Sequence, residues 1–221
     1  MCGRFVRVSP YVVISEAFLL SGPALERGGS FNIAPGQDIA AVVAGPGGRR
    51  LEFFRWGFVP TWSKDPKAST INARSETVAV KPSFRDALRK RRCLLIADGF
   101  YEWHKGRKKR PFYITRHDGR PFGMAGIYET STLYGAPRTT CAIITVPANK
   151  LIEPLHDRMP AIIARGDEGP WLDCEGKDLQ KILGALRPFP AEEMKLHEVA
   201  PLVNSPFHDF PRCIEPVNGS T

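Results

Sequence analysis

A cysteine stands at position 2, directly behind the initiator methionine, in the opening segment MCGRF. Trimming of Met1, which a small second residue favours, exposes the α-amine of Cys2 beside its own thiol. No other position in a chain offers this pair of nucleophiles on one residue. The placement is either incidental or used in chemistry, and the rest of the sequence decides between these interpretations.

Three further segments are unusual for a scaffold: INARSET (71–77), ADGFYEW (97–103) and LHDRMP (155–160). The first holds Asn72 and Arg74 after a loop. The second places Glu102 between two aromatic residues, and the third places His156 beside an acid and an arginine. These are the residue types that supply amide hydrogen bonds, anion contacts and proton transfer.

Each of these residues also has an ordinary structural interpretation. An asparagine caps turns, and Arg74 can pair with Glu76 or another acid. Glu102 can be a surface residue on an alternating strand, in phase with His104. A loop histidine is often satisfied by a neighbour, which here is Asp157. Only the joint occurrence of the four segments favours a functional site.

Bulk properties exclude several classes of protein. The chain has 221 residues, is 43% hydrophobic and contains no apolar run near 18 residues, so we expect no membrane span. Its start lacks the pattern of a signal peptide, which predicts a cytoplasmic protein. The five cysteines are widely spaced and contain no C-x-x-C pair, so we expect no structural zinc site and no disulfide framework. Cys93 and Cys141 lie in apolar runs and are expected to be buried.

The positive charge is concentrated. The formal net charge is +8, and ten Lys or Arg residues against three acids lie between Arg85 and Arg110. Most belong to the runs RKRR (89–92) and KGRKKR (105–110). Two basic runs that flank one apolar strand predict a polyanion-binding surface. The alternative is a solvated helix end followed by a hairpin loop.

Local patterns predict an α+β fold with a mainly antiparallel, barrel-like or sandwiched sheet and short peripheral helices. Ser9 and Pro10 are typical of a helix start, which indicates a helix over 10–20. HDGRP (117–121) indicates a hairpin turn. Strands are expected at 38–45, 50–60, 93–105, 111–117, 121–130, 139–148, 158–164 and 196–206, and helices at 81–92, 168–175 and 177–186. One domain over 1–221 is expected, with its last few residues disordered.

Together the segments resemble the SRAP (SOS response-associated peptidase) family. The motifs MCGRF, FNIAPG (31–36), WGFVP (56–60), INARSET, ADGFYEW, IITVPAN (143–149) and LHDRMP stand in family order. One departure is Ser63 after Trp62, where some members carry two adjacent tryptophans. The chain ends at the domain boundary, without the long tail of animal members, which indicates a bacterial protein that associates with the nucleoid when bound to DNA.

The resemblance implies that the protein traps abasic sites in single-stranded DNA. The α-amine of Cys2 would attack the C1′ aldehyde of the opened sugar, and the thiol would close a thiazolidine ring. An α-amine has a pKa of roughly 7.7–8.0, against about 10.4 for lysine, so a useful fraction is unprotonated at neutral pH. Glu102 would act as general acid and base, His156 as proton donor, and Asn72 would hold the sugar or amine.

The resemblance also implies a set of DNA contacts. Arg4 and Arg74 would bind phosphates, with Asn32 and Thr145 as lesser polar contacts. Trp62 and Pro35 would stack on or wedge against exposed bases. No cofactor, metal or membrane is implied, and we expect a monomer whose partner is single-stranded DNA containing abasic sites.

Two other functions stay open at this point. The family name favours a cysteine peptidase that uses Cys2, Glu102 and His156, with removal of Met1 as one self-processing event. A non-covalent reader of modified or single-stranded DNA is the third possibility. Replacing Cys2 by alanine or serine distinguishes the three, since only the reader keeps its activity.

Overall fold

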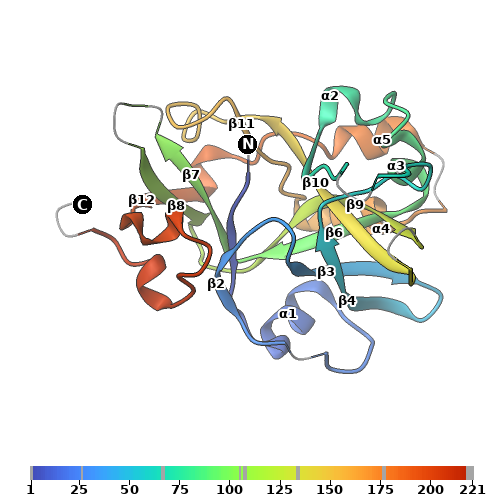
Figure 1. Cartoon of the computed structure of the whole chain (residues 1–221), viewed down its shortest axis with the longest axis horizontal. Helices are drawn as coiled ribbons and strands as arrows, with labels where there is room; N and C mark the ends of the chain where they lie inside the picture. Colours follow the sequence, from blue (N-terminus) through green and yellow to red (C-terminus); the bar gives the residue numbers. More distant parts are fainter. Residues whose placement is uncertain are drawn as a thin grey trace.

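The computed structural model describes residues 2–25, 27–65, 68–104, 106, 109–132, 135–175 and 178–217. Within these residues the strands form two sheets, which Figure 1 shows on either side of the chain's start. The first sheet has the order β12-β8-β7-β1-β2. Its strands are β12 (Met194–Glu198), β8 (Arg110–Arg116), β7 (Gly99–His104), β1 (Phe5–Arg7) and β2 (Ser30–Ile33).

The second sheet curls into a ring. Its order is β11-β10-β4-β3-β6-β9, β5 pairs with β10, and β10 also pairs with β9. Its strands are β3 (Asp38–Gly45), β4 (Gly48–Trp56), β5 (Asn72–Arg74), β6 (Arg92–Ala97), β9 (Phe122–Ser131), β10 (Arg138–Pro147) and β11 (Arg158–Pro160). All six residues of β6 are buried, so its apolar run forms part of the core. The predicted fold class is confirmed, although the ring is not a true barrel.

The helices are short and lie around the sheets, as predicted. They are α1 (Tyr11–Phe18), α2 (Ser75–Val78), α3 (Arg85–Lys90), α4 (Glu168–Leu172) and α5 (Leu179–Gly184), with 3₁₀ turns η1 (Arg165–Asp167), η2 (Ala191–Glu193), η3 (Pro201–Asn204) and η4 (Pro211–Cys213). The predicted helix start was one residue early. Pro10 is the N-cap, and the hydroxyl of Ser9 donates to Asp98 instead of capping the helix.

The single strand predicted over 93–105 is wrong. It is two strands, β6 and β7, which break at Asp98 and belong to different sheets. The Asp98 carboxylate accepts hydrogen bonds from the backbone N–H groups of Val8 (2.5 Å) and Ser9 (2.8 Å). The next residue must be glycine, because a Cβ at Gly99 would lie 2.4 Å from the ring of Tyr113. These contacts redirect the chain toward the first sheet.

The predicted hairpin at HDGRP is also wrong. β8 pairs with β7 and β12, whereas β9 pairs with β6 and β10, so the strands on either side of the turn belong to different sheets. The turn itself forms, since Asp118 accepts from the backbone N–H of Arg120 at 3.0 Å and Gly119 has a φ of 69°. Turn chemistry therefore identified the reversal but not the strand partners.

Cys93 and Cys141 are fully buried in β6 and β10, as predicted. No helix among the described residues has the length and apolar character needed to span a bilayer. Three residues of the second basic run, Lys105, Arg107 and Lys108, lie outside the described residues, and so do residues 218–221 of the tail that was expected to be disordered.

Candidate functional site around Cys2

Cys2 lies three residues before β1 of the first sheet and contacts β5 of the second. β1 pairs with β7, with Phe5 opposite Phe100, and the backbone N–H of Tyr101 donates to the Arg4 carbonyl at 3.0 Å. Antiparallel pairing therefore carries the residues before Phe5 along β7 toward Glu102. The Cys2 side chain is fully buried.

Asn72 reaches Cys2 from the other sheet. β5 is aligned by parallel pairing with β10, with Asn72 opposite Ile143. The side-chain Nδ2 of Asn72 donates to the Cys2 carbonyl oxygen at 3.0 Å. Its buried Oδ1 has no hydrogen-bond partner among the described residues. A buried amide acceptor without a protein partner is available to a group that binds beside Cys2.

Glu102 is buried rather than exposed. It is only 3% exposed on β7, so its interpretation as a surface residue in phase with His104 is wrong. Burial is the main cause that raises the pKa of the Cys2 thiol well above its ordinary value, and the negative charge of Glu102 raises it further. The thiol is therefore held in its protonated form at neutral pH.

His156 is fixed by its neighbours in the turn before β11. Its Nδ1 lies 2.9 Å from the backbone nitrogen of Arg158 and 2.9 Å from Oδ1 of Asp157. The contact with Asp157 matches the ordinary interpretation of a satisfied loop histidine. β10 pairs with β5 along one stretch and with β11 immediately beyond, so one strand aligns the segments that carry Asn72 and His156.

Arg158 follows His156 by two residues, and the sequence predicted no role for it. It is 8% exposed, and its guanidinium binds both carboxylate oxygens of Glu76 and the carbonyl of Thr145. Its hydrogen bonds to Glu76 lower the pKa of that carboxyl. Thr145 is fully buried, with its hydroxyl 3.4 Å from the Ala73 carbonyl. The only feature of the sequence that points to Arg158 is its position within the segment LHDRMP.

Arg4 and Asn32 bind the C-terminal segment. Nη1 of Arg4 donates to Oδ1 of Asn32 at 2.7 Å and to the Val203 carbonyl at 2.6 Å. Asn32 is fully buried and donates to the carbonyls of Ser205 and His208. Burial lowers the pKa of Arg4. These contacts, and the burial of Thr145, join parts of the scaffold, and the contacts of Arg4, Asn32 and Thr145 with DNA stay predictions.

The other expected DNA contacts are on the surface. The Trp62 side chain is 65% exposed, which is unusual for the largest apolar residue type. Pro35 and Arg74 are exposed as well. The Arg74 side chain forms no ion pair or hydrogen bond among the described residues, so the pair with Glu76 is absent and Glu76 binds Arg158 instead.

Half of the basic run RKRR is structural. Arg92 is 1% exposed and donates to the carbonyls of Trp171 (2.6 Å), Leu88 (2.7 Å), Arg89 (3.0 Å) and Asp173. Arg91 forms an ion pair with Glu129 at 2.6 Å. The interpretation of the whole run as a polyanion-binding surface is therefore wrong for these two arginines. Arg92 binds carbonyl groups inside the fold, and Arg91 is neutralised by Glu129. Arg89 and Lys90 remain exposed.

Comparison with known proteins shows the family of the chain. The family model "SOS response associated peptidase (SRAP)" matches residues 1–206. The abasic site processing protein YoqW of Bacillus subtilis is 40% identical over 97% of this chain and 99% of its own. The abasic site processing protein YedK of Escherichia coli is 30% identical over 98% of this chain and 100% of its own. A crystal structure of a Bacteroides thetaiotaomicron protein matches with a TM-score of 0.87 at 25% identity, over 98% of this chain and all of that one. The chain belongs to the SRAP family.

Proposed function

We propose that this protein processes abasic sites in single-stranded DNA by bonding covalently to them through Cys2. The observation that carries the proposal is the placement of Cys2 beside two polar side chains from different sheets. Asn72 holds its carbonyl oxygen, and the buried Glu102 acts on its thiol electrostatically. The names of the relatives YoqW and YedK, both abasic site processing proteins, agree with this substrate.

The chemistry begins at the α-amine, which removal of Met1 exposes. The amine adds to the C1′ aldehyde of the opened sugar, and loss of one water gives an imine. The Cys2 thiol then adds across the C=N bond, its sulfur to carbon and its proton to nitrogen, to give a thiazolidine. Ring closure is intramolecular, so it competes well with hydrolysis of the imine.

The protonated thiol favours this order of events over peptidase chemistry. A cysteine peptidase needs a thiolate, which nearby positive charge normally stabilises. Here burial and Glu102 raise the pKa of the Cys2 thiol, which disfavours the thiolate. An amine nucleophile does not need the thiolate, and the later thiol addition delivers a proton as well as sulfur.

Glu102 and His156 supply the proton transfers in this proposal. Glu102 takes and returns protons as the amine adds and water leaves, and His156 donates to the departing ring oxygen when the sugar opens. Asn72 orients Cys2 through Nδ2 and offers Oδ1 to the α-amine of Cys2 or to the incoming sugar. Trp62 and Arg74, both exposed, supply base stacking and a phosphate contact.

Intact-mass spectrometry after mixing with abasic single-stranded DNA tests the proposal. We expect loss of Met1 and an adduct whose mass equals protein plus DNA minus one water. A form that retains an extra residue before Cys2 keeps its thiol but has no amine there, and we expect it to form no adduct. Crosslinking at the normal rate by that form would exclude the mechanism. Cleavage of a peptide substrate that Cys2→Ser abolishes would support the peptidase instead.

A further inference from the structure

Arg158 links the two segments that carry His156 and Asn72. Its backbone N–H donates to Nδ1 of His156 at 2.9 Å, in the turn before β11. Its guanidinium reaches α2, where it binds both carboxylate oxygens of Glu76. Helix α2 directly follows β5, and Asn72 is the first residue of β5. One arginine therefore connects the histidine segment with the asparagine segment.

β10 lies between these two segments. Its residue Thr145 pairs with Arg74 of β5 and also with Pro160 of β11, so the two strands flank β10 on opposite edges. The Arg158 side chain crosses β10 and donates to the Thr145 carbonyl on the way to Glu76. The link therefore spans three neighbouring strands of the second sheet.

Backbone pairing alone gives both segments few contacts. β5 and β11 have three residues each, so each forms only a short ladder with β10. The pair between Glu76 and Arg158 adds a two-point contact of fixed orientation, because the planar guanidinium meets both carboxylate oxygens. The Glu76 side chain is 48% exposed, so solvent screening keeps the contribution of the pair to stability small. Its main consequence is therefore geometric.

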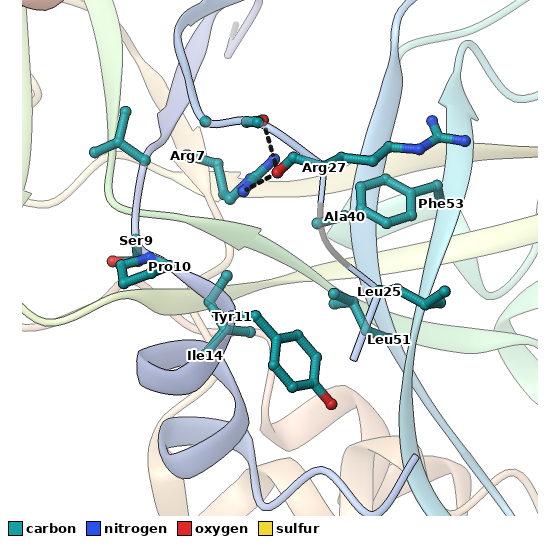
Figure 2. Close-up of a pocket in the computed structure, with 13 residues that line it drawn as sticks. Arg7, Ser9, Pro10, Tyr11, Ile14, Leu25, Arg27, Ala40, Leu51 and Phe53 are labelled. Atoms are coloured by element: carbon teal, nitrogen blue, oxygen red, sulfur yellow. Dashed lines mark hydrogen bonds between the residues drawn. The ribbon is translucent and has the colours of Figure 1, made fainter. Parts of the chain in front are cut away.

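Arg7, the last residue of β1, is a contrasting arginine. It is also buried, but it donates to the backbone carbonyls of residues 27–28, beside the cavity that Figure 2 shows. Replacing such an arginine removes the donors of backbone carbonyls. Arg158 instead binds a side chain of another segment of the candidate site, so a substitution at Glu76 removes the contact and leaves the backbone hydrogen bonds in place.

We propose that the pair between Glu76 and Arg158 fixes the relative position of the two segments that it joins. The ring of His156 and the amide of Asn72 are thereby held at one separation on the two sides of β10. Both members of the pair are positioning residues for the reaction at Cys2, so the proposal rests on the function proposed above. Without the pair the two short strands can shift, and a shift of about 1 Å slows a reaction whose groups must act together.

Glu76→Gln tests the proposal, because it keeps the size of the side chain and removes its charge. Single-turnover adduct formation with abasic single-stranded DNA gives the rate at saturating DNA and the DNA concentration at half that rate. We expect the saturating rate to fall about tenfold. The half-saturating concentration should stay the same, and the urea midpoint of unfolding should change little.

Glu168→Gln is the matched control. The Glu168 carboxylate binds Arg49 at 3.0 Å, and Arg49 also donates to a backbone carbonyl, that of Phe18. This pair joins α4 to β4 rather than the two segments of the candidate site. We therefore expect Glu168→Gln to form adduct at the unaltered rate.

A double substitution tests whether the pair acts through His156. In a His156→Ala chain the ring is missing, so its position no longer matters. Adding Glu76→Gln to that chain should therefore slow the reaction little further. Slowing by the same factor in both backgrounds would show that the pair acts elsewhere and would overturn the proposal.

Three other results would also overturn it. An unaltered saturating rate in Glu76→Gln, or equal slowing in Glu168→Gln, would leave the pair with a role in the scaffold only. Tighter DNA binding by Glu76→Gln would show instead that the acid masks Arg158 as a phosphate ligand. Failure of the function proposed for Cys2 is distinct, because the unaltered chain would then form no adduct, and this inference would fall with it.

Discussion

Asn72 donates a hydrogen bond from its side-chain Nδ2 to the carbonyl oxygen of Cys2, at 3.0 Å. The two residues are 70 positions apart: Cys2 precedes β1 of the first sheet, and Asn72 begins β5 of the second. The contact fixes the first peptide unit after the proposed nucleophile, and it leaves Oδ1 of Asn72 as a buried acceptor at the site. In the reaction that we propose, Asn72 orients both partners, and this role is a prediction that substitution tests.

We predict that Asn72→Ala slows adduct formation about tenfold, the effect of losing one well-placed hydrogen bond. Asn72→Asp should be slower still, because a carboxylate opposite the Cys2 carbonyl replaces attraction by repulsion. Single-turnover rates with abasic single-stranded DNA measure both. Ser75→Ala, three residues along the same segment, is the control. Unchanged rates in both Asn72 variants would remove Asn72 from the mechanism.

Glu102 and His156 should affect different steps. Glu102→Gln keeps the shape of a buried side chain but cannot take a proton, so we expect imine formation to slow about 100-fold. His156→Ala should slow opening of the sugar. Borohydride captures the imine, so the time course of borohydride-trapped adduct measures the rate of all steps up to the imine in each variant. If both variants react at the unaltered rate, Cys2 acts as a simple N-terminal aminothiol held near DNA.

The family resemblance named the candidate site, whose roles stay predictions, whereas local patterns predicted only part of the scaffold that holds it. Cys2, Asn72 and Glu102 do lie together, but no periodicity indicates it, because β1 and β5 have three residues each and were not predicted. The break at Asp98 was missed, although Asp98 and Gly99 are both poor strand formers, because the apolar and aromatic residues on either side favour a strand. The cause of the break is tertiary, since its carboxylate binds the backbone of Val8 and Ser9.

The basic run shows the same limit for charge patterns. A sequence reports the charge of Arg92 but not that four carbonyls surround it. A solvated and a buried arginine look the same in a sequence. Only the packing of α3 and α4 against β6 shows that Arg92 is buried. A buried arginine is rare, so the solvated interpretation was the natural one.

Arg92 should therefore contribute to stability rather than to DNA binding. We predict that Arg92→Met lowers the free energy of unfolding by about 3–5 kcal/mol, because it leaves buried carbonyls of α3 and α4 without donors. Urea denaturation measures this. Arg89→Ala, an exposed arginine of the same run, should change stability by less than about 0.5 kcal/mol. Equal stability of the two variants would contradict the structural role.

Stability should depend on Glu76 at low pH. Its folded-state pKa lies below the unfolded value because Arg158 binds the carboxylate. The unfolded state therefore binds its proton first as pH falls, and stability from this pair is complete above about pH 5 and is lost below that. The difference in unfolding free energy between the unaltered chain and Glu76→Gln should thus be constant at neutral pH and shrink in acid.

The control for this pH dependence is Glu153→Gln, an exposed acid that forms no ion pair among the described residues. Its stability difference from the unaltered chain should not change across the same pH range. The Glu76 side chain is 48% exposed, so solvent screening keeps its contribution small. A Glu76→Gln difference that is independent of pH would show that the ion pair with Arg158 does not form in solution.

Arg74 and Arg4 should differ in how they affect DNA binding, although the family resemblance assigns both to phosphates. Arg74 is exposed and has no partner among the described residues, so we predict that Arg74→Ala reduces the log–log salt slope of binding by about 0.7, the value for one phosphate of a single strand. The Arg4 guanidinium already donates hydrogen bonds to Asn32 and to the Val203 carbonyl. Arg4→Ala should therefore lower the unfolding free energy and leave the salt slope unchanged.

Anisotropy titrations on undamaged single-stranded DNA at several salt concentrations measure the slopes without the covalent step. A slope that falls equally in both variants would mean that Arg4 leaves the C-terminal segment to bind a phosphate.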